Sequence, residues 1–107
     1  MNKTITIAII GLGQVGNYLY RELNLKKKDI EKKTGKNIQV VALSAKNKNK
    51  KRKYKINKNI FYSDPIKIIK DIKPDILFEV IGQADGISKK IVETALKNKI
   101  HVITPNK

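Results

Sequence analysis

The sequence contains no cysteine and no tryptophan, and its only histidine is His101. The lack of cysteine excludes disulfide bonds, thiolate metal sites and a cysteine nucleophile, and one histidine is too few for a histidine-based metal centre. We therefore expect no metal site. Any redox chemistry of this chain has to come from a bound organic cofactor.

Long hydrophobic runs are also missing. The apolar run from Ile5 to Ile10 is interrupted by Gly11 and Gly13, well short of the roughly 20 apolar residues that a membrane span needs. A length of 107 residues leaves room for one domain, residues 1–107, without internal repeats. We expect a soluble cytoplasmic protein with no membrane partner.

Acidic residues are scarce, and the formal net charge is +15. No acidic residue lies between Glu31 and Asp64. The segment from Lys46 to Lys58, here called the cationic segment, is dense in lysine and also contains Arg52. Such a charge raises the possibility of a nucleic-acid-binding arm. The segment is polar and lacks hydrophobic periodicity, which favours a solvated, mobile loop instead. We expect no specific nucleic-acid partner.

Short, β-branched apolar runs alternate with segments of helical periodicity along the chain. The runs predict five strands, at residues 4–10, 38–43, 60–62, 76–81 and 100–104. Because strands that alternate with helices form right-handed βαβ crossovers, the pattern predicts an α/β fold. Its form is a Rossmann-type doubly wound parallel sheet with the strand order 3-2-1-4-5.

Three helices are predicted between these strands. In the first, after Gly16, the apolar stripe consists of Val15, Tyr18, Leu19 and Leu23, with Ile30 as a possible extension. Asp64-Pro65 is typical of a helix start, since aspartate caps free amides and proline fits the first turn. That helix ends before Pro74, and the third runs from about residue 87 to 98.

The residues Gly11-Leu12-Gly13-Gln14-Val15-Gly16 match the dinucleotide-binding pattern G-x-G-x-x-G, and they lie between a predicted strand and a predicted helix. Gly11 suits a tight turn, Gly13 lets the backbone approach a pyrophosphate, and Gly16 lets the helix pack against the strand. The free amides of the helix N-terminus favour the anion. A strand-to-helix turn without a ligand is the alternative.

The end of the second predicted strand indicates which nucleotide is bound. Proteins that prefer NAD carry an acidic residue there, which accepts the ribose hydroxyl groups. This sequence has Leu43-Ser44-Ala45-Lys46 instead and continues into the cationic segment. We expect Ser44, Lys46 and Arg52 to bind a 2′-phosphate. NADP is therefore favoured, and NAD stays possible.

Further candidates follow the fourth and fifth predicted strands. Glu79 either has a substrate-side role at the carboxyl edge of the sheet or is a surface residue that faces solvent or pairs with lysine. Gly82 is a candidate for close approach to the nicotinamide ribose. Thr104 and Asn106 are expected to line the same crevice, whereas His101 begins its strand and should lie at the opposite end.

Three stretches are informative in combination: Ile9 to Gly16, Phe78 to Gly82 and His101-Val102-Ile103-Thr104-Pro105-Asn106-Lys107. Together they resemble homoserine dehydrogenase, and the resemblance covers the whole chain but only about the first third of a family member. The family's Thr-(Ala or Pro)-Asn-Lys element is the most specific match. It implies a catalytic role for Lys107, beside nicotinamide and substrate.

The resemblance also implies a reaction, the NADPH-dependent interconversion of L-aspartate 4-semialdehyde and L-homoserine in threonine, methionine and isoleucine biosynthesis. A cationic Lys107 would stabilise alkoxide charge on this small-molecule substrate. The resemblance implies that the family's substrate-binding and dimerisation region lies outside these 107 residues. We expect the full-length protein to be a homo-oligomer through that region and this portion alone to be inactive.

Three alternatives remain open. The chain could be the NADP-binding domain of another small-substrate dehydrogenase, such as a glucose-fructose-type or aspartate-semialdehyde-type enzyme. It could be a nucleotide-binding module without catalysis. It could also be a basic nucleic-acid binder, which salt-dependent DNA binding without cofactor binding would indicate.

Overall fold

The computed structural model describes residues 3–81 and 86–104. Its sheet has four parallel strands in the order β2-β1-β3-β4, so β1 is flanked on both edges. The parallel sheet confirms the α/β prediction. The strands are β1 (Thr4–Ile10), β2 (Asn37–Ser44), β3 (Ile76–Glu79) and β4 (His101–Ile103).

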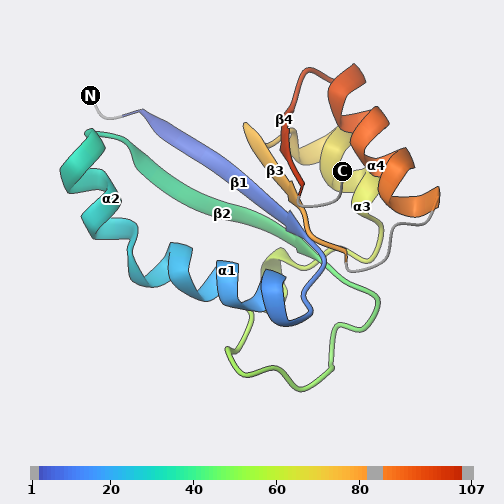
Figure 1. Ribbon diagram of the computed structural model, residues 1–107, viewed down its shortest axis with the longest axis horizontal. Coiled ribbons are helices and arrows are strands. Elements are labelled where there is room, and N and C mark those ends of the chain that lie inside the picture. Colours follow the sequence, from blue (N-terminus) through green and yellow to red (C-terminus); the bar gives the residue numbers. More distant parts are fainter. Residues whose placement is uncertain (1–2, 82–85, 105–107) are drawn as a thin grey trace.

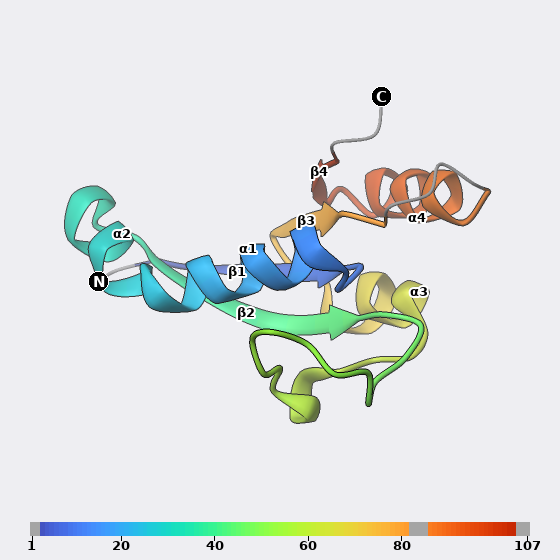
Figure 2. The ribbon, with the colours of Figure 1, turned by 60° about the horizontal axis from the view of Figure 1, so that its bottom comes forward.

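Helices cover both faces of this sheet. One face carries α1 (Gln14–Leu25) and α2 (Lys27–Thr34), and the other carries α3 (Pro65–Lys67), the π-helical turn η2 (Ile68–Ile72) and α4 (Gly86–Lys97) (Figure 1). A short 3-10 turn, η1 (Lys58–Ile60), interrupts the long connection between β2 and α3. Figure 2 shows this connection running beside β2.

The alternation of side chains along β1 gives the protein two hydrophobic cores, one on each face of the sheet. Ile7 and Ile9 pack with Tyr20 and Leu43 beneath α1. Ala8 and Ile10 point to the other face, where the buried side chains of the π-helical turn and α4 cover them: Ile68, Ile69, Ile91 and Ala95. Burial on both faces explains why β1 is almost continuously apolar.

The third predicted strand, residues 60–62, is reduced to a single bridge. Phe61 pairs in parallel with Leu43, and the Tyr62 amide donates to the Leu43 carbonyl at 2.8 Å. The segment lies beside β2, at the edge of the sheet where the predicted order 3-2-1-4-5 places it. The predicted order is therefore only partly visible, because residues 60–62 do not form a full strand. The physical reason is that the 3-10 turn before Phe61 and the helix start at Asp64 leave too little extended chain.

The rotation of α1 differs from the predicted stripe. Val15 and Tyr18 are 63% and 61% exposed, while Asn17 and Tyr20 are buried. The expected inward position of Val15 and Tyr18 is therefore wrong. Gly16 packs directly against the Gly11 carbonyl, so the side of α1 that carries Gly16 and Tyr20 faces the protein, and Val15 and Tyr18 face solvent.

The second predicted helix start is confirmed in detail. The Asp64 carboxylate accepts a hydrogen bond from the Ile66 amide at 2.9 Å, and Pro65 occupies the first turn. The helix ends at Lys73, which has a positive φ of 51°, directly before Pro74. Both ends therefore follow from local residue chemistry.

At the amino edge of the sheet, Thr6 and Asp75 connect β1 to the start of β3. The Asp75 carboxylate accepts from the Thr6 amide at 2.8 Å and from its hydroxyl at 3.1 Å, and the Asp75 amide donates to the Thr6 hydroxyl at 2.9 Å. The two residues are 69 positions apart in sequence. They define the register between two strands that are distant along the chain.

Candidate functional site

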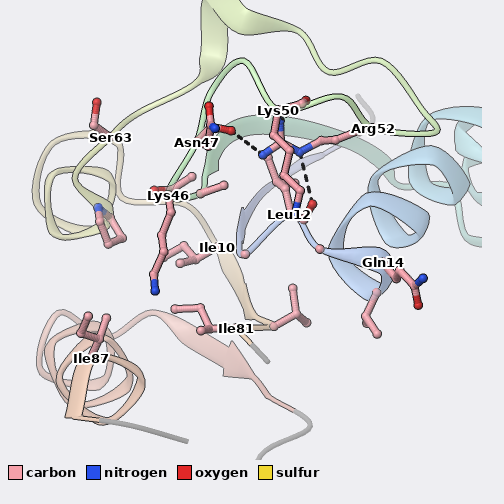
Figure 3. A pocket seen from close by; sticks show the side chains of 17 residues that line it. Ile10, Leu12, Gln14, Lys46, Asn47, Lys50, Arg52, Ser63, Ile81 and Ile87 are labelled. Atoms are coloured by element: carbon pink, nitrogen blue, oxygen red, sulfur yellow. Dashed lines mark hydrogen bonds between the residues drawn. The ribbon is translucent and has the colours of Figure 1, made fainter. Parts of the chain in front are cut away.

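A cleft of about 780 Å³ opens at the carboxyl ends of β1, β2 and β3. This is the position at which open parallel sheets bind their ligands. The turn after β1, the segment after β2, the end of β3 and the first turn of α4 all contribute to its walls (Figure 3). Its lining includes residues 10–15, 44–47, Lys50, Arg52, Ser63, Pro65, Val80, Ile81 and Ile87.

Two of the three glycines in the turn after β1 are required by the protein's own packing. Gly11 has a φ of +105°, and a Cβ there would lie 2.8 Å from the backbone of Val80. A Cβ on Gly16 would collide with the Gly11 carbonyl. These glycines allow β1, α1 and β3 to meet closely, as predicted for the first and third positions of the pattern.

Gly13 is different, because no contact among the described residues, 3–81 and 86–104, requires a glycine there. A Cβ on Gly13 would have no neighbour within 4 Å, and its φ of −73° is open to any residue. Gly13 is the N-cap of α1 and offers no side chain to the first amides of the helix. The open space beside Gly13 is therefore available to a ligand.

The residues between these glycines divide between core and cleft. Leu12 is buried in the core under α1, and Gln14 and Val15 are exposed in the first turn of that helix. All three also line the cleft. The structure thus brings the whole predicted turn, residues 11–16, to one edge of the sheet, where the N-terminus of α1 gives a positive electrostatic potential.

The end of β2 forms the neighbouring wall of the cleft. Ser44 is buried, and its carbonyl accepts from the Gly11 amide at 2.8 Å. Lys46 is exposed, and its side chain extends into the space between Ile10, Ile81 and Ile87 (Figure 3). No acidic residue is among those lining the cleft in the part of the chain that the structure describes. Ser44 and Lys46, both predicted site residues, therefore line the same cleft as the glycine turn, residues 11–16.

The cationic segment is anchored more firmly than its sequence indicated. Ile56 is buried in the core beneath α1, and the Tyr54 ring packs edge-on against Tyr20 at a centroid distance of 5.5 Å. The Asn17 side chain donates to the Tyr54 carbonyl and accepts from its amide. These contacts correct the expectation of a wholly solvated loop.

Arg52 lies at the border between this segment and the glycine turn. Its guanidinium group donates to the Leu12 carbonyl at 3.2 Å and to the Asn47 carbonyl at 2.7 Å. Sequence reasoning named Arg52 as a phosphate ligand and did not anticipate these bonds. It also missed Asn17 and Lys50; the signal for Asn17 was a polar residue directly after Gly16 on the inner side of α1.

Glu79 is 1% exposed, so the alternative of a solvent-facing carboxylate is wrong. It accepts hydrogen bonds from the Ile81 amide at 2.8 Å, the Ser88 hydroxyl at 3.2 Å and the Thr104 hydroxyl at 2.8 Å. Glu79 thus joins the end of β3 to α4 and to the residue after β4. Hydrogen bonds of this kind compensate for the burial of a carboxylate.

The remaining predicted residues lie at both ends of the sheet. Thr104 is at the carboxyl edge, bonded to Glu79, whereas His101 pairs with Ile76 at the start of β3 and is exposed. His101 is therefore at the end opposite the cleft, as predicted. The predicted site residues Gly82, Asn106 and Lys107 lie outside the described residues.

Two general features of the described ranges bear on function. No helix there combines the length and the apolar composition that crossing a bilayer demands. The same ranges contain no group of three histidine, aspartate or glutamate side chains placed to hold a metal ion. The cleft with its glycine turn is thus the feature from which a function can be argued.

Comparison with known proteins agrees with this geometry. Curated homoserine dehydrogenases of Bacillus subtilis and Neisseria gonorrhoeae are 28% and 29% identical over 105 residues, which is 98% of this chain and 24% of each relative. The chain thus spans about a quarter of their length.

Solved structures give the same result. A crystal structure of Staphylococcus aureus homoserine dehydrogenase is 34% identical in sequence and has a TM-score of 0.88. The match covers 100% of this chain and 27% of the S. aureus chain. The fold is also shared with a hyperthermophilic archaeal homoserine dehydrogenase mutant in complex with NADPH, which is 20% identical and has a TM-score of 0.68. That match covers 97% of this chain and 36% of the archaeal chain.

The family model described as homoserine dehydrogenase, NAD binding domain, matches residues 11–107. This match begins at the first glycine of the turn and includes the cleft, the cationic segment and the sheet. Since it extends over nearly the whole sequence, the chain belongs to the family of homoserine dehydrogenase NAD-binding domains.

Proposed function

We propose that the cleft binds NADP, with its pyrophosphate at the N-terminus of α1. The observation that carries this proposal is the open space beside Gly13. Gly11 and Gly16 are explained by contacts within the protein, but Gly13 is not. A glycine that borders solvent at an uncapped helix N-terminus is well suited to main-chain approach by an anion.

The preference for NADP over NAD rests on the end of β2. Ser44 and the exposed Lys46 line the cleft where an acidic residue would accept the ribose hydroxyl groups of NAD. A carboxylate would repel a 2′-phosphate, whereas a lysine ammonium attracts it. Lys50 lines the same cleft and adds to its positive potential. The archaeal relative in complex with NADPH is consistent with this choice.

In the whole protein, this domain would serve the NADPH-dependent interconversion of L-aspartate 4-semialdehyde and L-homoserine. The nicotinamide supplies or accepts the hydride when it is bound. The chain's own contribution is to bind and orient the nucleotide, and the proposal gives Lys107 the task of stabilising negative charge on the substrate oxygen. Glu79 would act on the same edge of the sheet by holding Thr104 in place.

The test is titration of the 107-residue chain with NADPH, followed by nicotinamide fluorescence. Gly13→Asp places a carboxylate in the open space beside the helix N-terminus, and we expect at least a tenfold loss of affinity, which corresponds to about 1.4 kcal/mol. Gly35→Asp is the matched control, since it changes the net charge equally at the end of α2. Equal NADPH binding by wild type and Gly13→Asp would contradict the proposal.

A further inference from the structure

Arg52 directs most of its donors to main-chain carbonyls rather than toward the cleft. Its Nε donates to Leu12 at 3.2 Å, its Nη1 to Lys48 at 3.3 Å and to Lys50 at 3.0 Å, and its Nη2 to Asn47 at 2.7 Å. A guanidinium group has five N–H donors. Four of them are therefore engaged, and the side chain is half-buried.

These four bonds connect the segment after β2 to the turn after β1, and Arg52 itself is 40 positions away from Leu12 in sequence. Leu12 belongs to the glycine turn, where the pyrophosphate is proposed to bind. The other three carbonyls belong to the segment after β2, where the 2′-phosphate is proposed to bind. One side chain thus connects the two regions, and Figure 3 shows its bonds to Leu12 and Asn47.

Arg52 also lies between two hollows of the surface. The nucleotide cleft is on one side, and a second cleft of about 830 Å³ lies toward Asn17, Tyr18 and Tyr54 on the other. Residues 12–15, Lys50 and Arg52 line both. Arg52 and the backbone that it binds therefore form part of the wall of both clefts.

We infer that Arg52 is a positioning residue that sets the preference for a 2′-phosphorylated nucleotide without binding the phosphate itself. It gathers the carbonyls of residues 47, 48 and 50, and this curls the segment so that Lys46 and Lys50 line the cleft. The inference rests on the proposed function. It replaces direct phosphate binding by Arg52 with an indirect role.

Substitution by lysine separates the two roles. Arg52→Lys keeps the positive charge, so it would preserve the Coulomb part of a direct contact with phosphate, although not a bidentate one. A lysine carries its three donors on one nitrogen and lacks the planar fork of arginine, so it cannot reach four carbonyls on two segments. A positioning role therefore predicts that Arg52→Lys behaves like Arg52→Gln, in which the charge is lost.

The experiment compares wild type, Arg52→Lys, Arg52→Gln and Lys55→Gln as 107-residue chains. Lys55 is an exposed cation of the same segment that lines neither cleft, so it controls for the loss of charge. Dissociation constants for NADPH and NADH are measured by fluorescence titration. Amide hydrogen exchange over residues 46–54 is measured without nucleotide, to report the segment's conformation directly.

We expect both Arg52 variants to lose at least fivefold of the NADPH-over-NADH preference and to exchange faster over residues 46–54, and Lys55→Gln to keep wild-type values. A wild-type preference in Arg52→Lys, or unchanged exchange in Arg52→Gln, overturns the inference while the proposed function stands. Absence of binding of either nucleotide by the wild type overturns the proposed function, and the inference with it.

Discussion

The side chain of Asn17 and the backbone of Tyr54 form a reciprocal pair of hydrogen bonds, at 2.8 Å from Nδ2 to the carbonyl and at 2.9 Å from the amide to Oδ1. The pair imitates one step of a β-ladder between a helix side chain and an extended segment. It attaches the cationic segment to the first half of α1, beside the glycine turn. Asn17 is therefore a second anchor of that segment, independent of Arg52.

We expect Asn17→Ala to destabilise the protein by about 1–3 kcal/mol, because it leaves the Tyr54 amide and carbonyl without their partner. The effect should appear in urea unfolding and as faster amide exchange at Tyr54. Asn24→Ala, on the exposed side of α1, is the control and should change stability by less than about 0.5 kcal/mol. Equal unfolding of the two variants would show that the reciprocal pair contributes nothing.

We expect Gly16→Ala to destabilise the fold by about 3 kcal/mol or more, since the added methyl collides with the Gly11 carbonyl and the backbone has to shift. Gly35→Ala serves as the comparison. Gly35 has a φ of 71° at the end of α2 and open space around it, so alanine should cost only about 1 kcal/mol there. Chemical denaturation of both variants measures the difference, and a milder effect at Gly16 would refute the close-contact argument.

The burial of Glu79 makes a prediction about the carboxyl edge of the sheet. Glu79→Gln replaces an acceptor oxygen by an NH₂ group that faces donors from Ile81, Ser88 or Thr104. We expect a loss of about 1–3 kcal/mol in the free energy of unfolding.

The matched control is Glu93→Gln on the exposed side of α4. The partner of Glu93 is Lys89, in an exposed ion pair at 3.9 Å, and such pairs contribute about 0–1 kcal/mol. Thermal or urea unfolding should therefore separate the two variants clearly. Identical midpoints would mean that the hydrogen bonds of Glu79 do not stabilise the protein.

Lys46→Gln tests the electrostatic part of nucleotide preference. We expect the NADPH dissociation constant to rise about fivefold, or about 1 kcal/mol, and the NADH constant to stay nearly constant, because only NADPH carries the 2′-phosphate. The difference should shrink as salt is added. Lys36→Gln, just before β2 at the other end of the sheet, is the control; an equal loss of NADPH affinity there would point to net charge rather than to Lys46.

Local chemistry made much of the fold predictable. The glycine turn, the Asp64-Pro65 helix start and the apolar run of β1 each depend on residues that are adjacent or one turn apart. The same is true of the end of β2, where the sequence itself shows Lys46 and no aspartate or glutamate. These features placed the cleft at the correct edge of the sheet.

Contacts between distant segments could not be predicted in this way. Val15 and Tyr18 face solvent because the opposite side of α1, at Gly16, packs against the Gly11 carbonyl. Hydrophobic periodicity alone does not predict such a contact between a helix and the main chain of another segment. The anchoring of the cationic segment depends on Asn17, Tyr20 and Ile56, which meet only after folding. For the same reason, the sequence indicated a direct phosphate contact for Arg52 and did not indicate its hydrogen bonds to main-chain carbonyls.

The bond between Thr6 and Asp75 has a consequence for the order of folding events. β1 can pair with β2 as soon as residues 37–44 have been synthesised, but its other edge stays open until Asp75 and β3 follow. Closing so long a loop is entropically slow. During synthesis, therefore, we expect β1 to pass through a stage with one unpaired edge. Its free backbone groups could then bind a chaperone or a strand of a neighbouring nascent chain.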